Sequence, residues 1–322
     1  MITADESQWE HTSCAWCGST ASDVVFKGPD RLHNLPGVFY LCRCRQCGVF
    51  RQEPRLKWEH LSGYYPENYA AYNYDSGEAD SPLLRGLKNY GNVKRRRFVD
   101  KYQPGGRVLE IGCGTGAFLR ELVKSGKWEV EGIEPNQAAA AYATKILGVP
   151  IHQGRFSEVE LKPASYDAVI LWCVLEHLSQ PVQDLRHIYS LLKDGGWLIF
   201  SMPNYESLEA KVFGPFWSGW DLPRHLYIFP RPVLRQALAH IGFDHISERC
   251  ISTSYNALGH SLAFWSQSWE SNHPKARQVL LNCYRSWFAR LSFLLPLALL
   301  DRLNLTTNIT FAAQKSKAPE SS

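Results

Sequence analysis

Downstream of residue 106, short apolar runs alternate with longer segments whose apolar residues recur at helical spacing. The short runs predict buried strands, and the longer segments predict amphipathic helices. Strands are expected at 107–111, 129–133, 149–152, 167–172 and 196–202. Helices are expected between them, at about 116–125, 136–147 and 180–193. Because strands and helices alternate, the pattern predicts a doubly wound, mostly parallel sheet of the α/β class.

A second group of elements follows this alternating region. A helix is expected at 231–241, where Gly242 ends it, and the run Phe243–Thr253 is typical of a strand. A long apolar and aromatic helical insertion is expected at 257–303, before a last strand at 308–313. The polar tail after Gln314 is expected to be disordered.

The apolar run Leu291–Leu300 lies within the helical insertion. Its ten residues are too few to span a bilayer, which takes roughly 20. The first expectation is therefore a helical pair packed on the sheet or on a second subunit of a homo-oligomer. The alternative is a surface that makes peripheral contact with a membrane to reach a lipid-linked substrate.

The stretch Val108–Gly116 joins the first expected strand to the first expected helix through alternating glycines. Glycine lets the backbone turn sharply and lets a ligand approach closely, because it has no Cβ. Glu110, two positions before the first glycine, suits a ligand that carries an ammonium group. Glu134 ends the next expected strand, where a carboxylate can accept both ribose hydroxyls of an adenosine. An adenosine joined to an amino acid is S-adenosylmethionine (SAM).

Five motifs of this region resemble those of the class I SAM-dependent methyltransferases. They occur in the family's order and spacing, at Glu110–Gly116, Gly132–Pro135, Tyr166–Ile170, Leu175–Leu178 and Leu192–Gly196. The resemblance implies a seven-stranded, Rossmann-like sheet with an antiparallel last strand. It also implies in-line transfer of the methyl group of SAM to an acceptor.

The resemblance further implies which residues bind SAM. These are Glu110, Gly112, Cys113, Gly114, Gly116, Glu134, Pro135, Leu171 and Trp172. The glycine loop would lie beside the methionine part, whose ammonium group Glu110 would attract. Glu134 would hold the ribose hydroxyls, and Leu171 and Trp172 would flank the adenine.

Two histidines are the candidate catalytic residues, because histidine titrates near neutral pH and can take a proton from an acceptor hydroxyl. His225 is the first choice. It lies in an aromatic insertion, 203–229, that is expected to be a substrate lid, and its segment Trp220–Leu226 resembles one in methyltransferases encoded among glycan-assembly functions. His177 is the second choice, and a structural role is open for both. The ubiquinone-biosynthesis O-methyltransferases have a metal-binding Glu where this chain has Cys173, which argues against a catalytic metal.

The N-terminal segment carries two Cys-x-x-Cys-Gly motifs. Zn²⁺ favours four tetrahedral thiolates, and each motif offers two from one tight turn. The pair resembles a zinc ribbon whose structural ligands would be Cys14, Cys17, Cys44 and Cys47. Two alternatives stay open: Cys42 could form a pair with Cys44, or the four thiols could be free.

Composition limits the classes of function. The 322 residues are 45% hydrophobic and 20% charged, as in ordinary globular proteins, and allow one core plus an appendage. Three parts are expected: a zinc ribbon at 1–50, a linker with N-terminal helices at 51–106, and the methyltransferase domain at 107–322. No apolar signal segment follows Met1, so a cytoplasmic location with reduced cysteines is expected. The net charge of +4 does not demand a nucleic acid partner.

The linker holds five tyrosines that either pack it over the cofactor end of the sheet or line a site for a sugar or aromatic substrate. They are Tyr64, Tyr65, Tyr69, Tyr72 and Tyr74. The sequence favours methyl transfer to a small-molecule or glycan acceptor, such as a sugar hydroxyl on a nucleotide- or lipid-linked intermediate. An RNA methyltransferase that uses the ribbon and the basic run Lys94–Arg97 is the alternative. A non-enzymatic scaffold is the third reading, against which the intact cofactor motifs argue.

Overall fold

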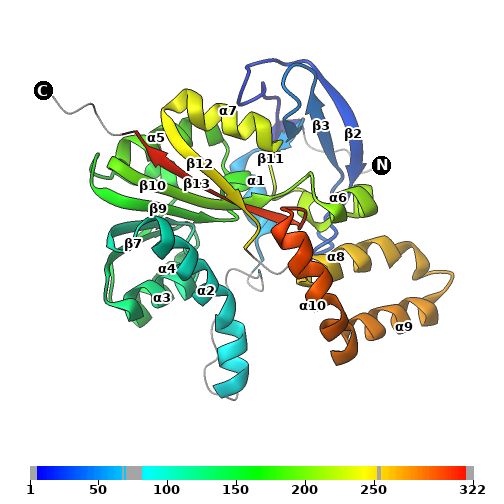
Figure 1. Ribbon diagram of the computed structural model, residues 1–322. Coiled ribbons are helices and arrows are strands. Elements are labelled where there is room, and N and C mark those ends of the chain that lie inside the picture. Colours follow the sequence, from blue (N-terminus) through cyan, green and yellow to red (C-terminus); the bar gives the residue numbers. More distant parts are fainter. Residues whose placement is uncertain (1–5, 67–68, 70–81, 252–254, 317–322) are drawn as a thin grey trace, which may run out of the picture.

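A seven-stranded sheet is the centre of the computed structural model, which describes residues 6–66, 69, 82–251 and 255–316 (Figure 1). The strand order is β12-β13-β10-β9-β6-β7-β8. The strands are β6 Gly106–Ile111, β7 Trp128–Glu134, β8 Ile151–Gln153, β9 Tyr166–Trp172, β10 Leu192–Pro203, β12 Phe243–Arg249 and β13 Asn308–Lys315. Neighbours from β10 to β8 are parallel, whereas β13 is antiparallel to both β10 and β12. The predicted doubly wound, mostly parallel class is confirmed.

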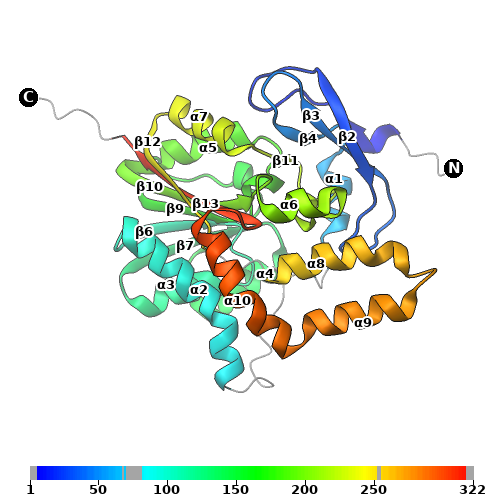
Figure 2. The ribbon, with the colours of Figure 1, turned by 45° about the vertical axis from the view of Figure 1, so that its right-hand side comes forward.

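Helices cover both faces of this sheet (Figures 1 and 2). One face carries α2 Pro82–Tyr102, α3 Ala117–Ser125 and α4 Gln137–Leu147, and the other carries α5 Pro181–Leu191 and α7 Arg231–Ile241. The apolar stripe of α5 is buried in one core, and Phe118 and Leu119 of α3 are buried in a second. Helix α5 ends before the predicted residue 193, because Leu192 already pairs with Tyr166 as the first residue of β10.

The N-terminal segment forms a small antiparallel sheet of its own. It contains β2 Ser22–Gly28, β3 Phe39–Cys44 and β4 Phe50–Gln52, while the short strands β1 Trp9–Glu10 and β5 Arg55–Leu56 pair beside it, before α1 Trp58–Leu61. A fourth strand, β11 Tyr227–Ile228, comes from the aromatic insertion and pairs with β4. The N-terminal sheet is therefore joined to the segment that carries His225.

A buried ion pair reinforces this junction. The Arg224 guanidinium donates to both carboxylate oxygens of Asp30, at 2.7 and 3.1 Å, and to both oxygens of Asp221, at 2.6 and 3.0 Å. The side chains of Arg224 and Asp30 are completely buried. Gln52 adds hydrogen bonds from its side-chain amide to the carbonyls of Pro223 and His225, at 2.8 and 2.7 Å. These contacts fix the backbone around His225 relative to the N-terminal sheet.

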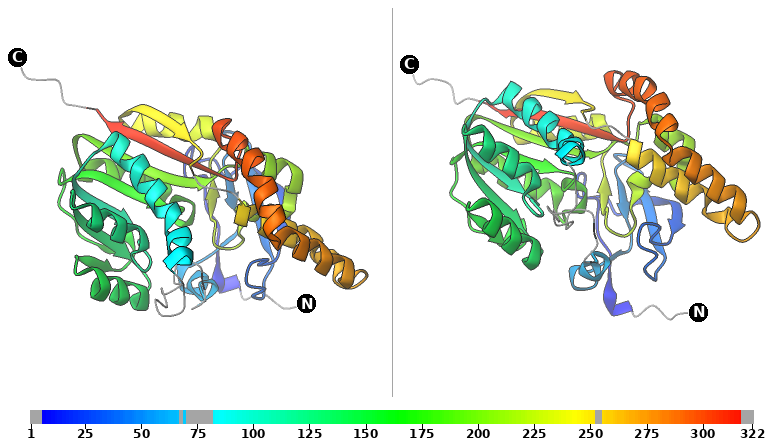
Figure 3. Two further views of the ribbon diagram at one scale, coloured as in Figure 1. Left: turned by 60° about the horizontal axis from the view of Figure 1, so that its bottom comes forward. Right: turned by 90° about the horizontal axis from the view of Figure 1, so that it is seen from below.

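The remaining helices lie at the carboxyl edge of the sheet. Helix α6 Leu208–Phe213 follows β10, while α8 Tyr255–Trp265, α9 Pro274–Arg285 and α10 Trp287–Arg302 lie between β12 and β13. Helices α8 and α9 form a hairpin that projects beyond the sheet, and α10 leads from the end of α9 back to β13 (Figures 2 and 3). Helix α8 is tied to the aromatic insertion, because the Ser218 hydroxyl donates to the Ala257 carbonyl at 3.1 Å. Within the described residues, no helix combines the length and apolar character needed to cross a membrane.

Some predictions fall beyond the described residues or differ at element ends. Strand β12 ends at Arg249, four residues short of the predicted Thr253, which lies outside the described residues. Strand β8 begins at Ile151 rather than at 149. Tyr72 and Tyr74 lie outside the described residues, as does most of the predicted tail after Gln314.

Candidate active site

A cavity of about 310 Å³ opens at the carboxyl ends of β6, β7 and β9. Parallel doubly wound sheets bind their ligands at this edge. Its lining combines residues at the ends of the strands and in the loops that follow them with aromatic residues of the N-terminal connection. The lining includes Gly112, Glu134, Pro135, Trp172, Cys173, His177, Trp58, Tyr65 and Tyr69. Four of the predicted SAM-binding residues and one of the two candidate histidines therefore meet at a single cavity.

The glycine loop has backbone angles that favour glycine. Gly112, Gly114 and Gly116 have φ angles of +71°, +54° and +75°. A Cβ on Gly116 would lie 2.6 Å from Leu147, so this glycine lets α3 pack against α4. Cys113 is buried, and a Cβ on Gly132 would lie only 2.9 Å from its Sγ. Of these loop residues, Gly112 is the one that lines the cavity.

Glu110 has an unsatisfied carboxylate next to this loop. Its side chain is buried, and its Oε2 has no hydrogen-bond partner among the described residues. Burial raises the pKa of Glu110 well above its ordinary value, an effect that the positive charge of Arg95 opposes. The Arg95 guanidinium lies 4.9 Å from the centre of the Trp172 ring. A ligand ammonium group would compensate the buried carboxylate, which fits the amino-acid part of SAM.

Glu134 is held by the backbone on both sides. Its Oε2 accepts a hydrogen bond from the Gly114 N–H and its Oε1 accepts one from the Asn136 N–H, each at 2.8 Å. Asn136 in turn caps α4 by accepting from the Ala139 N–H. A carboxylate offers about four acceptor positions, so two remain for the ribose hydroxyls. Leu171, the other residue predicted to flank the adenine, is completely buried in the core and does not line the cavity, whereas the neighbouring Trp172 does.

His177 lines the cavity from the short 3-10 turn Leu175–His177. Its Nδ1 is 3.0 Å from both the Tyr65 hydroxyl and the Arg224 carbonyl oxygen. Because a carbonyl only accepts, Nδ1 carries the proton and Nε2 is the basic nitrogen. Burial, followed by the neighbouring His225, lowers the pKa of His177 to about 3, so the ring is neutral.

His225 lies behind His177 and does not line the cavity. The two rings meet edge to face with centroids 4.6 Å apart. The Nδ1–H of His225 donates to the Gly219 carbonyl at 2.8 Å, and its Nε2 lies 3.9 Å from both Glu176 Oε1 and Asp221 Oδ2. Burial lowers the pKa of His225. The structure thus brings both candidate histidines together but gives only His177 access to a ligand.

Glu176 completes this histidine cluster. It is completely buried, and neither carboxylate oxygen has a hydrogen-bond partner among the described residues. Burial raises the pKa of Glu176 to about 8, so the protonated carboxyl is favoured at neutral pH. One ligand atom from each of Glu176, His177 and His225 lies within 4.8 Å of the others, so the three could also hold a cation. Cys173 is beside them as a neutral thiol, because burial raises its pKa to about 11.

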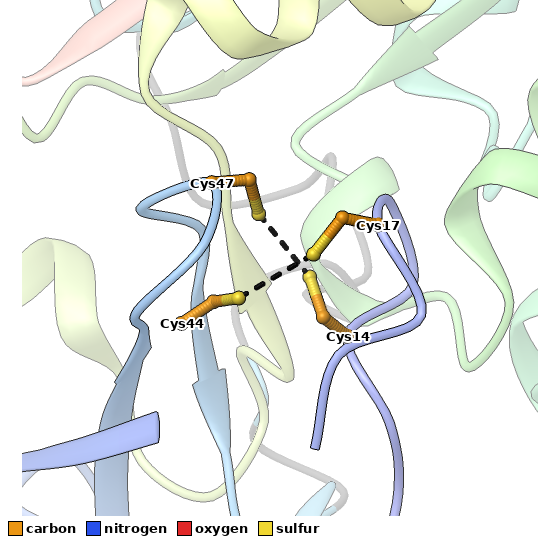
Figure 4. A group of neighbouring side chains, drawn as sticks. All are labelled: Cys14, Cys17, Cys44 and Cys47. Atoms are coloured by element: carbon orange, nitrogen blue, oxygen red, sulfur yellow. Dashed lines mark hydrogen bonds between the residues drawn. The ribbon is translucent and has the colours of Figure 1, made fainter. Parts of the chain in front are cut away.

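The four predicted zinc ligands come together in the N-terminal sheet (Figure 4). Their Sγ atoms lie within 4.8 Å of one another, with Cys14–Cys47 and Cys17–Cys44 separations of 3.4 and 3.5 Å. Tetrahedral Zn–S bonds of about 2.3 Å place sulfur atoms roughly 3.8 Å apart, close to these values. Cys42 is not part of this group, since its Sγ is directed to the Glu53 carbonyl at 3.5 Å. The four-cysteine set therefore fits Zn²⁺. The pair Cys44 and Cys47 is favoured over the pair Cys42 and Cys44.

Backbone donors also prepare this site. Gly18 and Gly48 close the two turns by donating to the carbonyls of Cys14 and Cys44, at 2.9 and 3.0 Å. The N–H groups of Cys47 and Gln46 donate to the Cys44 Sγ. Burial raises the pKa of Cys44, but the donated hydrogen bonds outweigh it and lower the pKa to about 7. A thiolate is the form that binds a metal.

Several residues of the site give no clear signal in the sequence. Arg95 belongs to a basic run on α2, and the positions of that run do not indicate that only Arg95 reaches Trp172. Tyr65 is one of several tyrosines in the linker. Glu176 is adjacent to His177 in a recognisable motif, and that adjacency is the one signal that could have placed it here.

Comparison with known proteins agrees with this geometry. The model of a family described as "Methyltransferase domain" matches residues 90–248. A ubiquinone biosynthesis O-methyltransferase of Nitrosospira multiformis is 32% identical over 181 residues, which cover 52% of this chain and 74% of that protein. The corresponding protein of Burkholderia thailandensis is 30% identical over 166 residues, covering 46% and 68%.

More distant similarities extend to other acceptors. A tRNA U34 carboxymethyltransferase of Ectopseudomonas mendocina is 26% identical over 164 residues, covering 48% of this chain and 49% of that protein. Phosphoethanolamine N-methyltransferase 2 of Haemonchus contortus, solved with SAM, shares the fold with a TM-score of 0.50 and 18% identity, covering 92% of this chain and 69% of that one. Together with the seven-stranded sheet, the glycine loop and the buried carboxylates of Glu110 and Glu134, these matches show that the chain belongs to the class I SAM-dependent methyltransferases.

Proposed function

We propose that this methyltransferase acts on a small-molecule or glycan acceptor, and specifically on a sugar hydroxyl of a nucleotide- or lipid-linked intermediate. The observation that carries the proposal is the placement of the neutral His177 in a cavity walled by aromatic rings. Trp58, Tyr65 and Tyr69 offer flat apolar faces against which a sugar ring can stack, and the tyrosines add polar hydroxyls.

The cofactor half of the cavity would hold SAM through residues already described. Glu110 would face the ammonium group, Glu134 would accept the ribose hydroxyls, and Trp172 would lie beside the adenine. When bound, SAM supplies an electrophilic methyl group on its sulfonium. The protein contributes by aligning the acceptor and excluding water, and positioning of this kind is worth about 7–11 kcal/mol.

His177 is the proposed general base. Its Nε2 would accept the proton of the acceptor hydroxyl while the Nδ1–H stays bound to the Arg224 carbonyl. The charge of Asp221 opposes the lowering of the His177 pKa by burial, so it would stabilise the imidazolium that forms. His225 would act as a positioning residue through its edge-to-face contact with His177. The insertion 203–229, which carries Asp221, Arg224 and His225, would cover the acceptor side.

The contacts made by the basic run Lys94–Arg97 weigh against an RNA acceptor. One relative is nevertheless named as a tRNA-modifying enzyme. Lys94 lies 3.9 Å from Asp301, and Arg96 pairs with Asp100 at 2.6 Å. Arg95 lies over the Trp172 ring. Most of the run therefore contacts the protein's own side chains, whereas phosphate binding needs free basic groups.

The experiment that tests the acceptor uses methyl-labelled SAM. Small-molecule, lipid and RNA fractions of a cell extract are each incubated with the purified enzyme, and the label in each is counted. Label in the small-molecule or lipid fraction supports the proposal. Label in RNA, together with RNA binding that weakens steeply with salt, would replace it with the RNA reading.

We also propose that Cys14, Cys17, Cys44 and Cys47 hold a structural Zn²⁺. All four ligands come from the protein, which leaves no open position for catalysis. The purified protein should contain one zinc per chain by elemental analysis. Cys44→Ser should lose the metal and lower the melting temperature, whereas Cys42→Ser, the matched control, should keep it. Retention of zinc by Cys44→Ser would contradict the assignment.

A further inference from the structure

Helix α10 exposes an unusual amount of apolar surface. Phe288 and Leu295 are 84% and 83% exposed, and Trp287 is 67% exposed. Leu291, Leu294 and Leu299 on the same helix are about half exposed, and we call these six residues the α10 surface. Scattered exposed apolar residues are normal, but a contiguous group of this size marks an interaction site.

The opposite side of α10 accounts for its attachment to the protein. Leu297 is buried, and Phe293 contacts the rings of Tyr255 and Tyr284 on α8 and α9. The helix thus has a side that packs and a side that faces solvent. The packed side fixes α10 to its neighbours and leaves the α10 surface largely exposed among the described residues.

Basic residues surround this surface. The segment 274–303, which holds α9 and α10, contains five basic residues and one acidic residue, a net charge of +4. Arg285, Arg290 and Arg302 are exposed at the two ends of α10 and along it. The one acidic residue, Asp301, is largely buried; it accepts from the Thr306 hydroxyl and lies 3.9 Å from Lys94. The solvent side of this segment is therefore apolar and positively charged.

We infer that the α10 surface binds peripherally to an anionic lipid bilayer. An apolar helix face flanked by arginines matches the two components of such a membrane, the acyl chains and the negative headgroups. A second copy of this chain is a poorer occupant, because a symmetric contact would bring together two copies of the segment 274–303, each with a charge of +4. At 16 residues, α10 is about 24 Å long, which suits a helix lying in the interface rather than crossing it.

The topology places this surface on the same side as the cavity. Pro203, at the carboxyl end of β10, pairs with Asn308, the first residue of β13. Helix α10 immediately precedes β13 and therefore joins the sheet at its carboxyl edge, where the cavity opens. A membrane-bound enzyme would present this edge toward the lipid. The inference does not depend on the nature of the acceptor.

Co-sedimentation with vesicles tests the inference. The full chain should bind vesicles that contain phosphatidylglycerol and bind those of phosphatidylcholine alone much more weakly. Phe288→Asp combined with Leu295→Asp should abolish the binding. Arg285→Gln and Arg290→Gln should each weaken binding about fivefold, the equivalent of about 1 kcal/mol per basic residue near an anionic surface.

Val24→Asp provides the matched control, because Val24 is an exposed apolar residue on the distant strand β2. It should leave vesicle binding unchanged. Unchanged SAM affinity and melting temperature would show that the α10 variants are folded. Equal binding to both kinds of vesicle, or none to either, would overturn the inference. So would a dimer in light scattering that Phe288→Asp dissociates, since that would assign the surface to a second copy.

Discussion

Replacing Glu134 by alanine should weaken SAM binding more than any other single change in the cofactor half of the cavity. The carboxylate is 3% exposed, and each oxygen already accepts one backbone N–H, so its orientation is fixed before a ligand arrives. Two acceptor positions remain for the two ribose hydroxyls. A hydrogen bond to a charged group contributes about 1.5–3 kcal/mol, so two contribute about 3–6 kcal/mol. Glu134→Ala should therefore raise the dissociation constant of SAM roughly 10²- to 10⁴-fold.

Titration calorimetry with SAM measures this effect directly. Glu129→Gln is the matched control, because Glu129 lies on the same strand with its side chain 74% exposed and should leave affinity unchanged. The melting temperature of the SAM-free protein must be measured as well, since the Gly114 and Asn136 N–H groups lose their acceptor. An unchanged SAM affinity in a folded Glu134→Ala protein would refute the assignment of this residue to the ribose.

Three further changes test other parts of the account. His177→Ala should lower the rate of label transfer roughly 10²- to 10⁴-fold while SAM affinity stays constant, and His225→Ala should cost less; equal rates for wild type and His177→Ala would remove the base. Asp30→Ala should lower the free energy of unfolding in urea by about 3–5 kcal/mol, because it breaks a buried ion pair, whereas Asp23→Ala, which breaks the exposed pair with Arg45, should cost less than about 1 kcal/mol. Burial and then Asp301 raise the pKa of Glu209 from 4.5 to about 8, so the folded chain binds this proton more tightly than the unfolded chain. Its contribution to stability is complete below pH 4.5 and is lost as the pH rises to 8; Glu209→Gln should flatten that fall, and an unaltered pH profile of unfolding would contradict the shift.

The local pattern predicted the sheet because its signals are repeated. Strands β6 and β9 and the second half of β10 are short apolar runs, and each intervening helix has an apolar stripe or a cap, such as Asn136 before α4. The element ends were less well predicted, as at the junction of α5 and β10. There the strand begins within the expected helix because Leu192 pairs with Tyr166, a contact between residues far apart in the sequence.

The proposed cofactor residues could be predicted from the sequence because they lie within motifs of a few residues. The proposed acceptor side could not, because it is assembled from distant segments. Tyr65, His177 and Arg224 meet through hydrogen bonds that span 47 to 112 positions, and β11 joins the N-terminal sheet from the aromatic insertion. Spacing alone could not show that His225 lies behind His177. Nor could it show that Cys42 is turned away from the other thiols.

The most direct test of the account is the position of the methyl group in the product. The labelled product of the reaction with cell-extract fractions would be purified and fragmented by tandem mass spectrometry. The expected product carries one methyl ether on a sugar ring, formed on a hydroxyl whose proton His177 accepts. A methyl group on a nucleobase or on an amine nitrogen would contradict it.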